Sequence, residues 1–269
     1  MAVLYALIPA LNEAANLDRL FSDLEVAQGV AAKHGLSLRI VLLDDGSTDG
    51  TPDRAVQAAG ELDVIVARHE RRQGPGRAFA TGFDLIASLL EDDDYVLTLE
   101  ADNTSRLEIL DLMLMRSREG HDAIFASPYM YGGGIVGATG SRTFLSHVAN
   151  SFVKAFLDIR GLLTVSSFYR LQRGGAVRRL QAHYGPGVVE RAGFECMVEL
   201  VLKMIYLGMS ISEVPMVLDS TRRIGKSKMR IVRTAFGYLG LFLRKRSWRA
   251  LAARPPAQTA APAAELVRL

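Results

Sequence analysis

Cysteine is almost missing from this sequence. Cys196 is the single cysteine among 269 residues, so no disulfide can form within the chain. This usage is typical of proteins in a reducing cytoplasm. Because Cys196 lies in an apolar helical pattern, we expect it in the hydrophobic core rather than at a reaction centre.

Long hydrophobic runs and histidine clusters are missing as well. No window reaches about 18 uncharged apolar residues, the length that a membrane-spanning helix needs. The N-terminal segment MAVLYALIPALNEAANL has no basic start, so we expect no signal peptide. The five histidines are scattered without the spacing of zinc ligands. These absences argue against a membrane-spanning protein and against a zinc enzyme.

Acidic residues are missing from one stretch, residues 222–249, which contains ten basic residues. The whole chain has a net charge of +3, so the remainder is net acidic. A basic block on an acidic body predicts an anionic ligand or surface for that block. It does not indicate a protein that binds nucleic acid with its whole face.

Two interpretations of the basic stretch stay open. In the first, it is a surface helix whose apolar stripe packs on the domain while its charges are solvated. In the second, which we favour, it lies on an anionic membrane with its Arg and Lys side chains at the headgroups. The side chains expected to enter that membrane are Phe236, Tyr238, Leu239, Phe242 and Trp248.

Short apolar runs alternate with helical patterns in the first half of the chain. Such an order predicts an α/β fold with a mostly parallel, doubly wound sheet. After residue 127 we expect helices over 141–159 and 194–207, and a strand over 211–218. We expect Asn12 or Asn16 to cap the first helix. The strands expected in the first half are 3–8, 38–43, 62–67, 96–99 and 123–126.

Two carboxylates, Glu100 and Asp102, end the fourth apolar run. Because alternate side chains of an extended chain point the same way, we expect these two to face one side. Together they can hold Mg²⁺ or Mn²⁺ against a diphosphate. A polar turn with a capping acid is the alternative for this motif alone. Thr104 and Ser105 are expected to cap the helix that follows.

Other polar clusters also follow apolar runs, at Pro9–Glu13 and at Asp44–Asp45. Ligands of doubly wound sheets bind where the strands end, so we expect all three clusters to share one crevice. The loop Gly74–Gly76 matches a dinucleotide fingerprint only loosely. It does not follow the first strand, and Phe79 stands where the third glycine should be, which argues against a Rossmann dehydrogenase.

Five segments, taken in their order along the chain, resemble the family 2 glycosyltransferases, and most closely their dolichol-phosphate mannosyltransferase-like branch. The resemblance covers about residues 3–229 and implies a GT-A fold, a nucleotide-diphosphate sugar donor and a divalent metal, Mg²⁺ or Mn²⁺. The segments are IPALNEAANL (8–17), VLLDDGSTDGT (41–51), RQGPGRAFATG (72–82), LTLEADNTS (97–105) and EVPMVLDSTRRIGKSKM (213–229).

The resemblance also assigns donor-binding residues by position. Pro9, Leu11 and Glu13 match the first donor-binding motif of the family. Asp44 and Asp45 match the second motif, which contacts the base and the ribose.

Further matches concern the nucleotide loop and the metal. Arg72 and Gly74 match the loop beside the nucleotide. Arg170 matches the arginine of the family's D-x-T-x-G-[FY]-R stretch, and it too is expected to bind the donor. Glu100 and Asp102 match the metal-binding pair, although the family usually has Asp at the first position.

Three residues are implied in catalysis besides Asp102. Arg222 and Lys228 match the basic residues of the R-x-x-G-x-S-K motif, which face the donor and acceptor phosphates. Glu199 matches a family glutamate on a helix beside the site. A metal with Arg or Lys would stabilise the charge that develops on the departing nucleoside diphosphate.

The favoured hypothesis is an inverting, metal-dependent transfer of a hexose to polyprenyl phosphate on the cytoplasmic membrane face. An anionic phosphate acceptor needs no strong base. A second hypothesis has a sugar or protein hydroxyl as the acceptor, with Glu195 or Glu199 as the base. A third is a catalytically weak nucleotide-sugar-binding subunit, motivated by Glu100 and by Pro128 and Thr164, where the family has Arg and Asp.

The expected organisation has three parts. Residues 1–225 form the GT-A domain, and residues 226–250 form the basic amphipathic helix. Residues 251–269 form an Ala/Pro-rich, disordered tail. This arrangement predicts a cytoplasmic protein attached peripherally to the inner face of the membrane.

Overall fold

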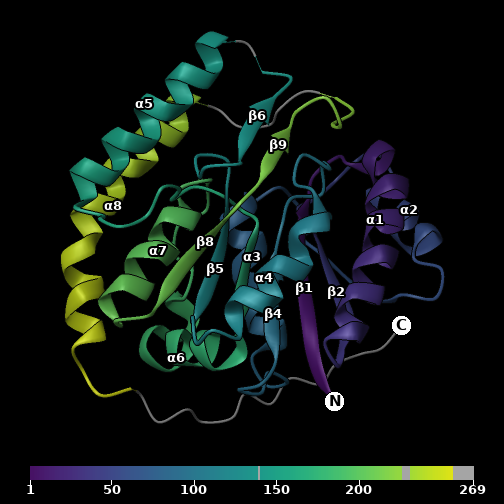
Figure 1. The fold of residues 1–269 in the computed structure, drawn as a ribbon, viewed down its shortest axis with the longest axis horizontal. Helices are drawn as coiled ribbons and strands as arrows, with labels where there is room; N and C mark the ends of the chain where they lie inside the picture. Colours follow the sequence, from purple (N-terminus) through teal and green to yellow (C-terminus); the bar gives the residue numbers. More distant parts are fainter. Residues whose placement is uncertain (139, 226–230, 257–269) are drawn as a thin grey trace.

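The computed structural model describes residues 1–138, 140–225 and 231–256, and the side chains of 141–146 and 231–236 are left aside (Figure 1). The described elements, in chain order, are β1 (Ala2–Ala10), α1 (Ala14–Lys33), β2 (Leu36–Asp44), α2 (Thr51–Ala58), β3 (Asp63–Arg68), α3 (Pro75–Ile86), β4 (Tyr95–Thr98), η1 (Leu107–Ile109), α4 (Leu110–Ser117), β5 (Ala123–Ser127), β6 (Gly134–Val136), α5 (Gly140–Leu157), β7 (Arg170–Arg173), α6 (Gly174–Tyr184), η2 (Gly185–Gly187), α7 (Cys196–Tyr206), β8 (Ile211–Pro215), β9 (Val217–Asp219) and α8 (Ile231–Ala252).

The central sheet has seven strands in the order β3-β2-β1-β4-β7-β5-β8. All neighbours are parallel except β7, which runs antiparallel to both β4 and β5. A second, two-stranded parallel sheet joins β6 to β9. The predicted α/β fold with a mostly parallel sheet is therefore confirmed.

Both faces of the sheet are covered by helices, which explains why its inner strands are apolar throughout. Leu4, Ala6 and Ile8 of β1 pack in one layer with α1, α2 and α4. Tyr5 and Leu7 point to the other layer, which contains α3, α6 and α7. Because the carboxyl ends of β1, β2 and β4 meet at one edge of this sheet, the turns after them are neighbours.

Helices α5 and α8 lie side by side along one flank of the molecule (Figure 1). Helix α8 packs against α6 and α7, and its Leu241 and Trp248 are fully buried in the core. The prediction that Trp248 enters a membrane is therefore wrong, since the protein itself surrounds the indole. The side chain of Phe236 lies outside the described residues.

The predicted strands hold to within three residues at each end, but the expected strand 211–218 is two strands. The break falls at Met216, whose N–H donates to Ser127 O at 3.1 Å. After the break, β9 pairs with β6 instead of continuing along β5.

Strand β7 carries no strand pattern in its sequence, because Arg170 and Gln172 are polar although both are fully buried.

The predicted caps are also wrong. Helix α1 begins after Glu13, and Asn16 lies inside its first turn. Asn12 precedes the helix in the left-handed region, with φ at 51°. After β4, the Thr104 hydroxyl donates to Asp102 Oδ1, and the helical segment begins only after Arg106. The side chains of Asn12 and Asn16 bond to turns that lie far from them in the sequence, which local capping rules do not foresee.

Residues 257–269, the greater part of the expected tail, lie outside the described residues. Within the described part, α8 continues to Ala252. None of the helices in this part combines the length and apolarity needed to cross a bilayer.

Candidate active site

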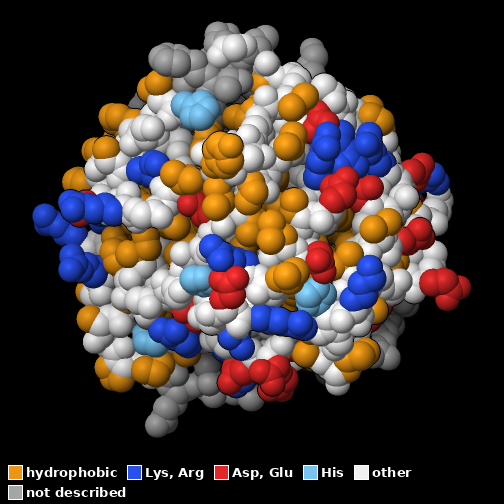
Figure 2. Space-filling model, in the orientation of Figure 1, with side chains coloured by type: hydrophobic (Ala, Val, Ile, Leu, Met, Phe, Trp, Pro, Cys, Tyr) orange, Lys and Arg blue, Asp and Glu red, His pale blue; other side chains and the backbone are white. Residues whose placement is uncertain are grey.

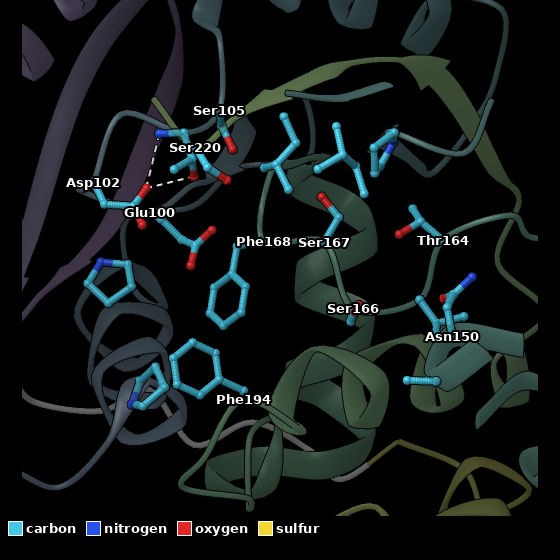
Figure 3. Close-up of a pocket in the computed structure, with 18 of the residues that line it drawn as sticks. Glu100, Asp102, Ser105, Asn150, Thr164, Ser166, Ser167, Phe168, Phe194 and Ser220 are labelled. Carbon is cyan, nitrogen blue, oxygen red and sulfur yellow. Dashed lines mark hydrogen bonds between the residues drawn. The ribbon is translucent and has the colours of Figure 1, made fainter. Parts of the chain in front are cut away.

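A cavity of about 620 Å³ begins where β1 and β4 end and continues beneath α5 and α8 (Figure 3). One end is polar and contains the acidic turns, whereas the other end is an arm with mostly apolar walls. Glu100 and Asp102 stand at the polar end, and Asn150 and Thr164 stand at the far end, with Phe168 between them (Figure 3). The polar end is lined by Pro9, Leu11, Glu13, Asp45, Arg72, Glu100, Asp102 and Arg223.

The turns after β1 and β2 are fastened to each other. Asn12 N–H donates to Ser47 Oγ at 2.8 Å, and Thr48 N–H donates to Asn12 Oδ1 at 2.9 Å. Glu13 N–H donates to Thr51 Oγ1 at 2.9 Å. These bonds hold the first turn, which presents Pro9, Leu11 and Glu13 to the cavity, in one position relative to the second.

Asp45 holds the basic glycine-rich loop against the crevice. Its carboxylate accepts hydrogen bonds from the N–H groups of Gln73 at 2.8 Å and Gly74 at 2.7 Å. His69 Nδ1 lies 2.9 Å from the same carboxylate. Gly74 has φ at 108°, a conformation that favours glycine. Asp45 therefore lines the cavity and also fixes the loop that carries Arg72.

Asp44 has a different position from its neighbour. It is buried beneath the turn, where both carboxylate oxygens accept the N–H of Ser47 at 3.2–3.3 Å. Arg68 lies 3.3 Å from it. Asp44 does not line the cavity, so of the two predicted acids only Asp45 is brought to the crevice.

The carboxylates of Glu100 and Asp102 both line the cavity, as expected from their spacing. Asp102 Oδ1 accepts from Thr104 N–H at 3.0 Å and from its hydroxyl at 2.7 Å, and Oδ2 accepts from Arg223 Nε at 2.7 Å. Burial, and then the charge of Asp102, raise the pKa of Glu100 to about 8.

These residues fit a divalent cation. Two neighbouring carboxylates supply hard oxygen ligands. Burial and the charge of Asp102 raise the pKa of Glu100 even though Arg223 lies beside Asp102, so additional positive charge would stabilise the ionised pair. No group of three or more Asp, Glu, His or Cys residues in the described part could hold a metal alone. A cation held here would thus share its coordination between Glu100, Asp102, water and a diphosphate.

Arg170 was predicted to bind the donor, but the structure places it elsewhere. It is fully buried, with its guanidinium 4.3 Å from the ring centre of Phe125. It donates to the backbone carbonyls of Val165, Ser167 and Met197 at 2.8–2.9 Å. Its role is to hold residues 165–168, which line the cavity, rather than to contact a ligand.

Glu199 was predicted beside the site as a catalytic residue or base, and it too lies elsewhere. Its buried carboxylate accepts the N–H groups of Glu190 and Arg191 at 2.8 Å and pairs with Lys203 Nζ at 2.5 Å. Burial raises the pKa of Glu199 and lowers the pKa of Lys203. Neither Glu199 nor Glu195 lines the cavity.

The basic motif places its arginines in an unexpected way. Arg222, the predicted phosphate-binding residue, points away from the cavity and pairs with Asp23 at 2.6 Å. Its neighbour Arg223 lines the cavity and binds Asp102. Lys228 lies outside the described residues. The sequence pattern alone could not tell which of two adjacent arginines faces inward.

Two more residues were missed by the sequence analysis. Asn16, predicted only as a possible cap, bonds to both backbone groups of Ile224 and so joins α1 to the basic loop. Asn150 of α5 lines the far end of the cavity. Only long-range contacts place these residues, and no local sequence signal marked them.

The sheet, its acidic crevice and its helical layers define a GT-A fold. Among solved structures, glucosyl-3-phosphoglycerate synthase from Mycobacterium tuberculosis, in complex with Mn²⁺ and UDP, is similar with a TM-score of 0.59 at 16% identity, over 92% of this chain and 79% of that one. Mannosyl-3-phosphoglycerate synthase from Rubrobacter xylanophilus has a TM-score of 0.54 at 15% identity, over 91% of this chain and 74% of that one.

Residues 5–180 match Glycosyl transferase family 2. Polyprenol monophosphomannose synthase of Mycolicibacterium smegmatis is 27% identical over 225 residues, 83% of this chain and 79% of that protein. Dolichol-phosphate mannosyltransferase of Pyrococcus furiosus is 26% identical over 90% of this chain, which spans 63% of that longer protein. The chain therefore belongs to glycosyltransferase family 2, in its dolichol-phosphate mannosyltransferase-like branch.

Proposed function

We propose that this protein transfers a hexose, with inversion, from a nucleotide-diphosphate sugar to a polyprenyl phosphate at the cytoplasmic face of a membrane. The observation that carries this proposal is the continuity of one cavity, in which an acidic crevice leads into an apolar arm. Such a cavity suits a charged donor and an acceptor that has an anionic head and a hydrocarbon chain. The relatives that act on polyprenol, dolichol and undecaprenyl phosphate by name support the same acceptor.

Donor binding is assigned to the polar end. The turn after β1 and the loop held by Asp45 would enclose the nucleoside, with Arg72 near its phosphates. Glu100 and Asp102 would hold Mg²⁺ or Mn²⁺, which supplies positive charge to the departing diphosphate. Arg223 stands close enough to Asp102 to act on the same diphosphate.

The apolar arm favours a lipid acceptor. Tyr238 and Leu239 of α8 form part of its wall, together with Phe168 and Phe194, whose ring centres are 5.5 Å apart. An isoprenoid chain buried here would gain about 25 cal/mol for each Å² of apolar surface removed from water. Further aliphatic and aromatic lining comes from Ile135, Phe152, Val153, Phe156, Leu157 and Val165.

The positions of the candidate bases weigh against a hydroxyl acceptor. A hydroxyl must lose a proton during attack, whereas a phosphate oxygen is already anionic. Glu195 and Glu199 are the bases that the hydroxyl hypothesis needs, and both lie outside the cavity lining. Glu199 is also engaged by Lys203 and two backbone N–H groups.

Membrane contact is assigned to the outer surfaces of α5 and α8. Phe152 on α5 is 65% exposed, and Phe242 and Leu243 on α8 are 40% and 75% exposed. Lys245 lies over the Phe242 ring at 4.4 Å. Figure 2 shows Lys and Arg side chains gathered along the edge formed by the C-terminal part of α8. Apolar and basic side chains together are typical of a helix at an anionic membrane surface.

The test uses a short-chain polyprenyl phosphate in detergent, so that membrane binding does not enter. A thermal-shift panel of GDP, UDP and dTDP, with and without Mn²⁺, first selects the donor, because a ligand of the folded state raises Tm. We expect a lipid-linked product whose anomeric configuration is inverted. Leu239→Glu places a charge in the apolar arm and should raise KM for the lipid by about tenfold or more, with nucleotide affinity unchanged.

Leu243→Glu is the matched control, since it makes the same change one helical turn along and outside the cavity lining. It should leave KM within about twofold of the original value. Transfer to a sugar hydroxyl without any lipid product would favour the hydroxyl hypothesis. Nucleotide binding without transfer to either acceptor would favour a binding subunit.

A further inference from the structure

We propose that Arg223 acts as a built-in counter-cation: it occupies the carboxylate of Asp102 until a divalent metal arrives, and metal binding displaces its guanidinium toward the diphosphate of the donor. The proposal rests on the proposed function, because it takes Asp102 as a metal ligand. It adds a coupling between metal binding and the basic loop, and it assigns that coupling to a single side chain.

All the acceptor positions described for Asp102 are in use. Oδ1 accepts the N–H and the hydroxyl of Thr104, at 3.0 and 2.7 Å. Oδ2 accepts Arg223 Nε at 2.7 Å and also contacts the Nη2 group of Arg223. The side chains are only 9% and 18% exposed for Asp102 and Arg223, so water screens this pair weakly. A metal that binds Oδ2 must therefore displace Arg223 or share the oxygen with it.

The backbone around Arg223 is held in place from both sides. Ile224 N–H donates to Asn16 Oδ1 at 2.9 Å, and Asn16 Nδ2 donates to Ile224 O at 3.1 Å. Arg222 is tied to Asp23 at 2.6 Å. At the start of the loop, Asp219 binds Arg106 at 2.8 Å. Because these anchors do not involve Asp102, the Arg223 side chain can leave the carboxylate while the loop stays seated.

The surroundings decide where a displaced guanidinium would go. A cation on Asp102 would repel Arg223, since like charges at short range in a buried site are unfavourable. Glu100, the other carboxylate beside Asp102, is itself taken as a metal ligand. Of the other carboxylates in the polar end, Asp45 accepts the N–H groups of Gln73 and Gly74, and Glu13 accepts Asn16 Nδ2. The incoming anion would be the diphosphate, for which the planar guanidinium has a suitable fork of donors.

The experiment measures Mn²⁺ binding by calorimetry and by electron paramagnetic resonance, without nucleotide or acceptor. Arg223→Met removes the competing cation and keeps most of the side-chain volume. We expect its Kd for Mn²⁺ to fall by about tenfold. In saturating Mn²⁺, the same variant should bind nucleoside diphosphate about tenfold more weakly, because the displaced guanidinium is lost. Arg223→Lys should lie between the original protein and Arg223→Met in both measurements.

Arg222→Met is the matched control, with the same charge change in the same loop but no contact with Asp102. Its Kd for Mn²⁺ should stay within about twofold of the original. Unchanged or weaker Mn²⁺ binding in Arg223→Met or in Arg223→Lys, or an equal gain in Arg222→Met, would overturn the proposal. Since no transfer is measured, a failure here leaves the proposed reaction standing, and a failure of transfer leaves this coupling intact.

Discussion

At the scale of single residues, the buried cations of this protein are structural. Arg170 donates to three backbone carbonyls in the core, and burial lowers its pKa to about 9, which still leaves it protonated at neutral pH. The carbonyls belong to Val165, Ser167 and Met197, so one side chain joins the cavity loop to α7. A family match at this position thus marks a residue that shapes the site without touching its ligands.

Replacing Arg170 tests this distinction. Arg170→Met should reduce the free energy of unfolding by about 3–5 kcal/mol, because three buried carbonyls lose their donor. At a temperature where the variant is folded, its nucleotide affinity should stay within about threefold of the original. Urea titration and calorimetry measure the two quantities.

Arg178→Met serves as the control for Arg170→Met, because Arg178 pairs on the surface with Asp92, where both side chains are well exposed. Its effect on stability should stay below about 1 kcal/mol. A large loss of nucleotide affinity in Arg170→Met, with little loss of stability, would restore the donor-binding interpretation.

At the scale of elements, α8 is fastened to the domain by a partly buried polar network. Trp248 Nε1–H donates to Glu190 Oε1 at 2.9 Å, and Lys203 Nζ lies 4.7 Å from the indole centre. Arg244 binds the other oxygen of the Glu190 carboxylate. Gly240 faces Arg191 so closely that a Cβ would overlap the guanidinium. Since α8 also walls the apolar arm, its seating controls the shape of the acceptor site.

The single tryptophan of the chain reports on this seating. Its emission should be blue-shifted and poorly quenched by acrylamide, because the indole is buried against the protein. Brominated lipids should not quench it. Gly240→Leu displaces the Arg191 guanidinium from its place against α8. We expect the helix to pack less closely, with the emission shifted to the red and acrylamide quenching raised about twofold or more.

The control is Gly29→Leu on α1, where a Cβ would meet nothing within 4 Å. This substitution should leave the Trp248 spectrum unchanged. Strong quenching of Trp248 by brominated lipids in the original protein would show that α8 leaves the domain at the membrane.

At the scale of the whole molecule, charge and apolar surface gather on the side that carries α8. Exposed Phe152, Phe242 and Leu243 lie on the flank formed by α5 and α8, and the basic cluster at 244–249 continues it. The apolar arm is walled by the same two helices, so an acceptor held in a membrane could enter from this side.

Flotation with anionic liposomes tests this surface. We expect the protein to float with the vesicles at low salt and to remain at the bottom of the gradient in about 1 M salt, where the Debye length is about 3 Å. Phe242→Asp combined with Leu243→Asp should reduce the floating fraction at low salt by about fivefold or more, because two exposed apolar contacts become anionic.

Leu112→Asp together with Met115→Asp makes the same change on α4, in the opposite helical layer, where both side chains are exposed. This control should float like the original. A full-length protein that stays in the dense fraction at low salt would contradict peripheral attachment.

The sequence by itself determined the strand positions of the first half, the α/β class and the acidic crevice. Apolar runs, turns and helical periods are local signals, and parallel strands bring their carboxyl ends to one edge of a sheet. Glu100 and Asp102 could be placed in this way because the spacing of two residues and the end of a strand are both visible in the sequence. The predicted position of Asp45 follows from the same reasoning.

Only the tertiary structure decided which residues of each family motif face the cavity. Arg222 and Arg223 are chemically alike, and the path of one loop turns the first to Asp23 and the second to Asp102. The face of α8 that carries Trp248 is buried because it packs on Glu190 and Lys203, which lie far from it in the sequence. The same reason applies to Glu100 and Asp102. Their spacing predicts a pair of metal ligands, while the fold brings Arg223 to Asp102.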